Sequence, residues 1–158
     1  MAGSFACKSN AGVAPQEQLL GTIAGNRRLS IGLPAEHNGG EKRFPLTPEG
    51  VALLTKEGYR IFVESGAGEG IKYSDLHYTE AGAQATTASE VFRCDVVLKI
   101  TPLNEQEAAM IRPGVFLLTL LQPQYQSASV VRILMQKKVT AVAIDLITDE
   151  RGRYLFAD

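Results

Sequence analysis

The chain has 158 residues and a mass of 17.1 kDa, with 45% hydrophobic and 21% charged residues, which excludes a disordered or low-complexity protein and allows one domain with a buried core. Its 16 lysines and arginines nearly balance its 17 aspartates and glutamates, so a broad nucleic-acid-binding face is not expected. Two cysteines are too few for a disulfide framework, no apolar run is long enough for a membrane span, and no secretory signal is recognisable, so we expect a reducing, cytoplasmic setting.

Residues 1–28 are interpreted as an N-terminal tail with a short helix at 15–20, because small and polar residues dominate before it. Residues 29–158 are interpreted as one folded domain, because short apolar segments begin to alternate with capped helices at residue 29. The predicted strands are 29–34, 60–64, 83–86, 96–100, 115–121 and 139–147.

Helix starts are predicted where an oxygen-bearing side chain precedes an early acid or proline. The signals are Thr47-Pro48-Glu49, Ser74, the capping box Thr87–Glu90, Asn104–Glu107, and Ser127 before a helix to Lys138. This alternation predicts an α/β fold with a doubly wound, mainly parallel sheet, a flavodoxin-like or Rossmann-like variant flanked by helices.

Two details of packing follow from the same patterns. The nearly continuous apolar strand 96–100 is typical of a strand buried on both faces. The helix before the last strand is expected to turn Val130, Val131, Leu134 and Met135 inward. It is also expected to place Lys137 and Lys138 at its C-terminal end, where the helix dipole favours cations.

In a parallel sheet of this kind, ligands bind beyond the carboxyl ends of the strands. The glycine-rich segment 65–70 follows a strand but fails the dinucleotide-binding spacing, because Ile71 stands where a third glycine is needed. Its helix also begins only at Ser74, too late for helix amides to hold a pyrophosphate. We therefore interpret this segment as a structural turn.

Arg43 follows the first strand and precedes a helix, so its planar guanidinium is a candidate for holding a carboxylate at two points. The alternative is that Arg43 caps loop carbonyls or pairs with Glu41. Lys99 lies inside an apolar strand, and its side chain is expected to reach out to solvent rather than act as a base. His37 and His77 are far apart, so no metal site is expected, and no nucleophile motif is present.

Five ordered segments carry a resemblance to a known family: IGLP at 31–34, EKRFPLTP at 41–48, VESGAGEG at 63–70, AGA at 81–83 and VLKI at 97–100. The sequence from 30 to 154 resembles the N-terminal domain shared by alanine dehydrogenases and the alpha subunit of NAD(P) transhydrogenase. The resemblance implies hydride transfer in a cleft between this substrate-side domain and a C-terminal Rossmann domain that binds NAD(H) or NADP(H).

That second domain is absent from the chain, so we expect no cofactor bound to this fragment and no activity of the fragment alone. The resemblance further implies a small-molecule substrate or a second nicotinamide as partner. It also implies a homo-oligomer when the protein is full-length, or a subunit of a membrane transhydrogenase.

The resemblance assigns substrate contacts to Arg43, Thr101 and Gln122. Arg43 matches the family's carboxylate-binding arginine, whereas Thr101 and Gln122 stand where alanine dehydrogenases have a lysine and the acid/base histidine. Neither replacement moves protons near neutral pH, so no residue is assigned as catalytic. These losses favour a transhydrogenase-like or diverged member. An alternative is a non-catalytic binding or interface module of the same family.

Overall fold

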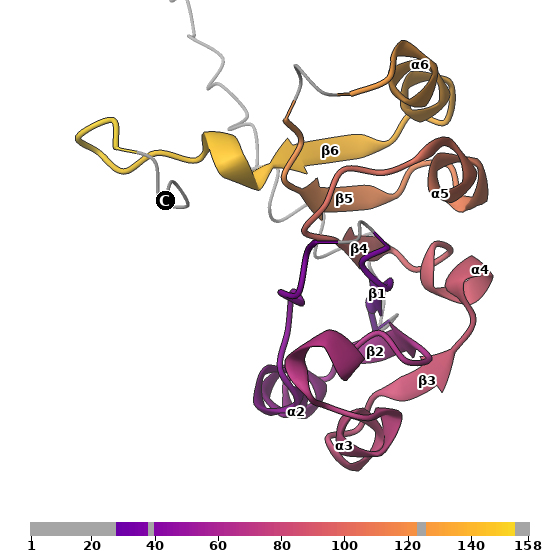
Figure 1. Ribbon diagram of the computed structural model, residues 1–158, viewed down its shortest axis with the longest axis vertical. Coiled ribbons are helices and arrows are strands. Elements are labelled where there is room, and N and C mark those ends of the chain that lie inside the picture. The colour runs from indigo at the N-terminus through magenta and orange to yellow at the C-terminus, as the bar shows by residue number, and fades with distance from the viewer. Residues whose placement is uncertain (1–27, 38–39, 123–125, 154–158) are drawn as a thin grey trace, which may run out of the picture.

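The computed structural model describes residues 28–37, 40–122 and 126–153. Within them, six strands form one sheet in the order β3-β2-β1-β4-β5-β6, and every neighbouring pair is parallel (Figure 1). The predicted α/β fold with a doubly wound parallel sheet is therefore confirmed. The predicted helix at 15–20, and all of the predicted tail except Arg28, lie outside the described residues.

The elements have the following bounds. The strands are β1 Ser30–Leu33, β2 Arg60–Glu64, β3 Gln84–Thr86, β4 Val96–Leu98, β5 Phe116–Thr119 and β6 Thr140–Ala143. The α-helices are α2 Pro48–Lys56, α3 Asp75–Glu80, α4 Ala88–Val91, α5 Glu105–Met110 and α6 Ala128–Gln136, and the 3₁₀ helices are η1 Glu69–Ile71 and η3 Ile144–Leu146.

Most helices begin where the capping residues predict. The Thr47 side chain accepts a hydrogen bond from the Gly50 backbone at the start of α2, and Asn104 and Glu107 form a reciprocal capping box at the start of α5. The capping box predicted at Thr87 is wrong in its chemistry, because Thr87 precedes α4 without a side-chain capping bond.

Three strands end earlier than predicted, and in two of them a carboxylate accepts a backbone N–H two residues beyond the strand end. The Ile100 N–H donates to Glu36 instead of extending β4, and the Leu121 N–H donates to Asp145 instead of extending β5. The last strand was predicted to reach 147 but ends at Ala143, where η3 turns Asp145 back toward the end of β5.

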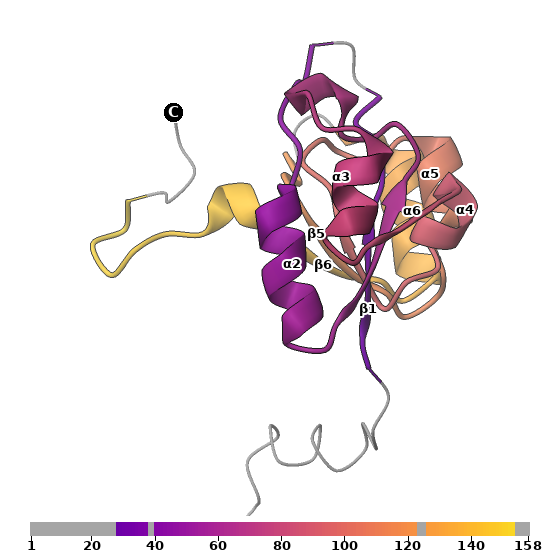
Figure 2. The same cartoon turned by 90° about the horizontal axis from the view of Figure 1, so that it is seen from below.

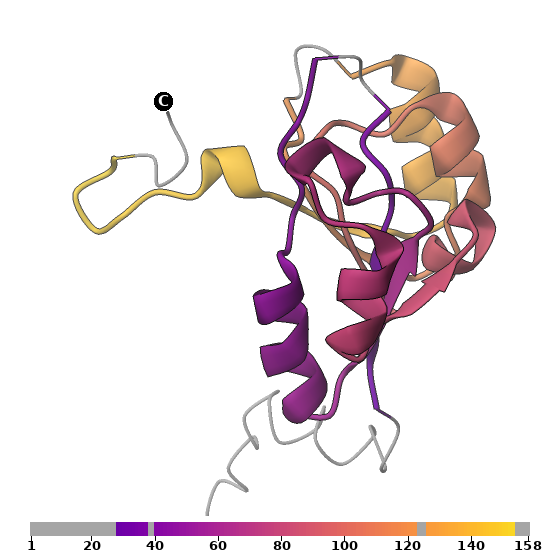
Figure 3. The ribbon, with the colours of Figure 1, turned by 60° about the horizontal axis from the view of Figure 1, so that its bottom comes forward.

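Two apolar clusters lie on the two faces of the sheet. Helices α4, α5 and α6 contribute to one cluster together with Val97, and α2 and α3 contribute to the other together with Val96 and Leu98. Figures 2 and 3 show these two groups of helices on opposite sides of the strands. The predicted burial of β4 on both faces holds only in part, since Val97 is buried but Val96 and Leu98 are only partly buried.

The inward face of α6 is narrower than predicted. Val130 and Leu134 are buried, as expected, but Val131 is 43% exposed and Met135 is 74% exposed. Residues four apart share one side of a helix, and the next residue is rotated by about 100° away from it. Val130 and Leu134 therefore pack into the core, whereas Val131 and Met135 remain at the solvent-exposed border of the helix face.

Helix α4 packs closely against β1, in the interior of the sheet, at Gly32. A Cβ atom at this position would lie 2.3 Å from the Val91 carbonyl oxygen of α4. Only glycine therefore allows α4 to approach β1 this closely.

Candidate functional site

The three residues predicted to contact substrate lie at the carboxyl edge of the sheet, after three different strands. Arg43 lies on the loop between β1 and α2, Thr101 follows β4, and Gln122 follows β5. Because β1, β4 and β5 are adjacent and parallel, their loops emerge side by side. The candidate site is built at this edge.

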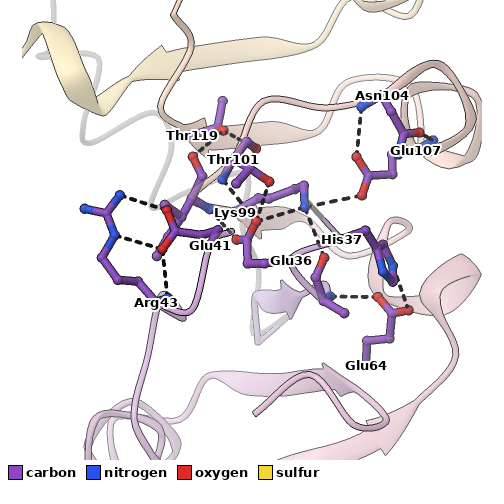
Figure 4. Close-up of polar contacts among 12 residues, drawn as sticks. Glu36, His37, Glu41, Arg43, Glu64, Lys99, Thr101, Asn104, Glu107 and Thr119 are labelled. Atoms are coloured by element: carbon purple, nitrogen blue, oxygen red, sulfur yellow. Dashed lines mark hydrogen bonds and ion pairs between the residues drawn. The ribbon is translucent and has the colours of Figure 1, made fainter. Parts of the chain in front are cut away.

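Arg43 binds an internal carboxylate. Its Nε and Nη2 atoms donate to the two carboxylate oxygens of Glu41 at 2.9 and 2.8 Å, and its backbone N–H adds a third bond at 2.8 Å (Figure 4). The Arg43 side chain is 63% exposed and that of Glu41 is 15% exposed. Hydrogen bonds from the Arg43 side chain are the main reason why the pKa of Glu41 falls to about 2. The pairing with Glu41, left open by the sequence, is present.

A pocket of about 280 Å³ lies beside Arg43, between the β1–α2 loop and the turn that follows β2. Glu64, at the end of β2, braces this pocket. One of its oxygens accepts the Ala35 N–H at 2.8 Å, and the other lies 3.6 Å from His37 Nε2. This volume is just below the range of about 300–1,000 Å³ typical of drug-sized ligands, and it is large enough for a small organic molecule.

Thr101 is buried, and its hydroxyl is directed into the protein. The hydroxyl donates to a Glu36 oxygen at 2.5 Å, and the Thr101 carbonyl accepts from the Thr119 hydroxyl at 3.1 Å. A substrate at this edge would therefore meet a threonine whose donor is already engaged.

Lys99 does not extend to solvent, and the sequence prediction for this residue is wrong. The residue is only 2% exposed, because three acceptors satisfy its ammonium within the protein. These are the Ala35 carbonyl at 3.0 Å, a Glu36 oxygen at 3.0 Å and a Glu107 oxygen at 3.3 Å (Figure 4). Burial of a lysine is tolerated only where its charge is paired in this way.

Glu36 and Glu107 are the residues that sequence reasoning missed. Glu107 was expected only as a helix cap, which it also is, since it accepts the Asn104 N–H at 2.9 Å. A usable signal was present. A lysine inside an apolar strand needs a carboxylate nearby, and Glu36 follows the end of the neighbouring strand β1.

Gln122 has an unusual backbone that a neighbouring carboxylate holds in place. Its φ angle is +40°, in the left-handed region that non-glycine residues rarely adopt. The N–H groups of Leu121 and Gln122 donate to the two oxygens of Asp145 at 3.0 and 3.1 Å. Strained residues of this kind are enriched at functional sites.

The glycine-rich turn after β2 is explained by packing. A Cβ atom on Gly68 would lie 2.5 Å from the ring of Tyr78, a fully buried residue of α3. The Tyr78 hydroxyl donates to the Leu46 carbonyl at 2.9 Å, and burial raises its pKa to about 12. Helix α3 begins only at Asp75, as late as predicted.

Three further features concern metal binding, thiol reactivity and membrane-spanning helices in the described part of the chain. No group of three or more His, Cys, Asp or Glu residues there is arranged to hold a metal ion. Burial raises the pKa of the Cys94 thiol to about 11, so it is a poor nucleophile at neutral pH. None of the helices within these residues is long and apolar enough to cross a membrane.

The family described as "Alanine dehydrogenase/PNT, N-terminal domain" matches residues 32–157. Among curated proteins, an alanine dehydrogenase of Staphylococcus saprophyticus is 34% identical over 120 residues, which cover 75% of this chain and 32% of the relative. The NAD(P) transhydrogenase subunit alpha of Haemophilus influenzae is 29% identical over 119 residues, which cover 75% of this chain and 23% of the relative.

Solved structures agree with these relatives. An L-alanine dehydrogenase has a TM-score of 0.75 and 27% identity over 80% of this chain and 35% of its own length. A transhydrogenase from Sinorhizobium meliloti has a TM-score of 0.71 and 28% identity over 77% of this chain and 37% of its own length. The chain thus spans about a quarter to a third of the length of the two curated relatives.

Proposed function

The chain belongs to the alanine dehydrogenase/PNT N-terminal domain family, and from that premise we propose that it is the substrate-side domain of an NAD(P)-dependent oxidoreductase. Its relatives bear the names of two oxidoreductases, alanine dehydrogenase and transhydrogenase. In this proposal a further domain closes over the carboxyl edge of the sheet and completes the active-site cleft. Assembly into a homo-oligomer, or with a membrane transhydrogenase, belongs to the same proposal.

The bidentate contact of Arg43 with Glu41 carries the proposal. A guanidinium that holds one carboxylate at two points, beside a pocket, has the geometry needed to hold another. A substrate carboxylate would replace Glu41 on Arg43, with the reacting part of the substrate in the adjoining pocket. Arg43 is thus proposed to bind and orient the substrate.

The cofactor is assigned to the further domain, because the described residues do not fit a dinucleotide. The backbone N–H groups of Ile100, Thr101, Leu121 and Gln122, which point outward from strand ends, are taken by Glu36 and Asp145. The glycine turn is filled by Tyr78. When bound, the nicotinamide would supply hydride transfer. The role proposed for this domain is to bind and orient the substrate.

Within the site, Gln122 is proposed to donate its carboxamide to a substrate carbonyl, which it can do without moving a proton. Thr101 is proposed to shape the wall of the site, since its hydroxyl is bound to Glu36. Neither residue supplies an acid or base, so with a carboxylate substrate any proton transfer would have to come from the further domain or from water. Direct hydride exchange between two nicotinamides needs no such group, and in that case Arg43 would have no substrate carboxylate to bind.

A second candidate function is a non-catalytic module, and the Glu41 contact also favours it. If Glu41 stays bound to the Arg43 guanidinium at all times, the loops beyond the C-terminal strand ends serve only for packing against the further domain. The protein produced from the complete gene separates the two. Assays with alanine, with pyruvate and ammonium, and with paired oxidised and reduced nicotinamides should show turnover in at least one; no turnover in any supports the module.

Replacing Arg43 tests the site itself. Arg43→Ala should weaken binding of the carboxylate substrate about tenfold to a hundredfold, because a charge-assisted bidentate contact is worth roughly 1.5–3 kcal/mol. Arg43→Lys should recover only part of this loss, since the charge remains but the fork is gone. KM and kcat of the full-length variants are the measurement.

The matched control is Arg153→Ala. Arg153 also contacts a carboxylate through its Nε and Nη2 atoms, that of Asp149, but it lies beyond β6. It should leave KM unchanged. An unchanged KM in Arg43→Ala, with a lowered melting temperature, would make Arg43 a structural residue.

A further inference from the structure

The carboxylate of Glu36 lies in a cradle of donors from another part of the chain. Glu36 follows β1, whereas all of its donors follow β4. Its oxygens accept from Ile100 N–H at 2.6 Å, Thr101 N–H at 3.1 Å, the Thr101 hydroxyl at 2.5 Å and Lys99 Nζ at 3.0 Å. Its side chain is only 4% exposed.

This arrangement is that of a bound anion. A carboxylate removed from water needs several hydrogen bonds and a cation to offset the loss of hydration, and these four donors supply both. Lys99 has two partners besides Glu36, Glu107 and the Ala35 carbonyl, which would keep this donor in place without Glu36. Glu36 therefore acts as an internal ligand that joins two loops.

The two loops are those that form the candidate site. The described residues between β1 and α2 form no helix or strand, so contacts with neighbouring strand ends must fix this loop. Glu64 holds the Ala35 N–H from the β2 side, and Glu36 holds the loop from the β4 side. Arg43 lies on the same loop, and Thr101 lies in the cradle.

We propose that Glu36 is a positioning residue of the site: its carboxylate locks the loop that carries Arg43 to the end of β4. The meaning of this lock for catalysis rests on the proposed function, whereas the lock itself does not. Its chemistry predicts that a small free carboxylate can replace a truncated Glu36 side chain in the cradle.

The first experiment uses the 158-residue chain, with formate and acetate as probes. Glu36→Ala should lower the melting temperature by on the order of 10 °C, because it leaves two amides without their acceptor and removes one of the two carboxylates that pair with the buried ammonium of Lys99. Formate should restore part of this loss, whereas chloride at equal ionic strength should not. The amide signals of Ile100 and Thr101 in NMR spectra should move away from their wild-type positions in the variant and return with formate.

Glu36→Gln is the matched control. It fills the same volume but places an amide N–H₂ among donors, so it should be destabilised without rescue, because no space remains for formate. If Glu36→Ala does not fold, Glu36→Asp keeps the carboxylate and should show weakened but present Ile100 and Thr101 signals. Absence of formate rescue in Glu36→Ala, or equal rescue in Glu36→Gln, would overturn the cradle.

The second experiment uses the full-length enzyme well below its melting temperature. Glu36→Ala should lower kcat/KM about ten- to a hundredfold, mainly through KM, because the loop with Arg43 is no longer fixed. Formate should lower this KM again in the variant but not in the wild type. Rescue of stability with KM unchanged would reduce Glu36 to a structural role. A wild-type enzyme without turnover would refute the proposed function, and the formate rescue would still decide the cradle.

Discussion

Glu41 shows how a neighbour two positions away can change the chemistry of a carboxylate. Arg43 lowers the pKa of Glu41 from its ordinary 4.5 to about 2, chiefly through side-chain hydrogen bonds. A lowered acid pKa stabilises the folded state above the unfolded pKa, and this contribution is lost as the pH falls through the folded pKa. The relevant window is therefore between pH 4.5 and about 2.

We predict that the pair contributes fully above this window and nothing below it. Exposed pairs are worth roughly 0.2–1 kcal/mol, so wild type and Arg43→Ala should differ in melting temperature by at most about 4 °C at pH 7. The difference should vanish as the pH approaches 2. Melting curves recorded by circular dichroism across the range test this. Lys42→Ala removes the same charge next door and should show no such convergence; convergence in both variants would assign the effect to net charge.

At this scale the sequence predicted residue types better than partners. The sequence identifies Arg43 as a candidate for carboxylate binding and leaves its pairing with Glu41 open as an alternative. The environment of Lys99 was not predictable from local pattern, because its partners come from after β1 and from α5. A side chain's burial depends on groups that only the fold brings together.

The helices illustrate how capping chemistry can act between elements as well as within them. Lys137 follows α6, and the sequence predicted that it serves the dipole of that helix. Its ammonium instead donates to the Ala108, Ala109 and Ile111 carbonyls at the end of α5, at 3.1, 2.5 and 2.8 Å. These carbonyls belong to the end of a six-residue helix, where backbone acceptors lack partners within the helix.

Lys137→Ala should therefore destabilise the protein by about 1–2 kcal/mol, which corresponds to a fall of roughly 2–8 °C in melting temperature. Lys138→Ala is the adjacent control, since Lys138 is exposed and its replacement removes the same charge. It should change the melting temperature little. Equal effects of the two substitutions would show that net charge, and not the cap of α5, is responsible.

Element order and helix starts were predictable because capping residues and apolar runs are local signals. Strand ends were not, since Glu36 and Asp145 come from distant loops to bind the N–H groups just beyond β4 and β5, and β6 turns into η3. The inward face of α6 was predicted too wide for a similar reason. Val131 and Met135 are as apolar as their buried neighbours, and only the packing partners distinguish them.

At the scale of the whole sheet, carboxylates accept hydrogen bonds from backbone N–H groups just beyond the C-terminal ends of the strands. This occurs after four strands. Glu64 accepts the N–H of Ala35, and Asp75 accepts that of Gly66. Glu36 accepts the N–H groups of Ile100 and Thr101, and Asp145 accepts those of Leu121 and Gln122. Nucleotide-binding sheets use such free N–H groups for phosphates. In this protein the same positions already carry negative charge.

The 158-residue chain should therefore bind NAD(H) weakly or not at all. Isothermal titration calorimetry with NAD⁺ and NADH measures this, and a low-micromolar site on the chain alone would contradict it. The full-length protein is the positive control, because the further domain is expected to supply the cofactor site. If NAD(H) binds the full-length protein but not the 158-residue chain, the result agrees with a cofactor site that lies outside this domain.

The strand order has a consequence for how the chain is synthesised. Strand β1 emerges first and occupies the interior of the finished sheet, between β2 and β4. β2 and β3 then add in turn on one side, and β4, β5 and β6 add in turn on the other. Each new strand thus meets an edge that already exists, and none has to be inserted between two strands already paired. The sheet can grow outward during translation without ever being opened.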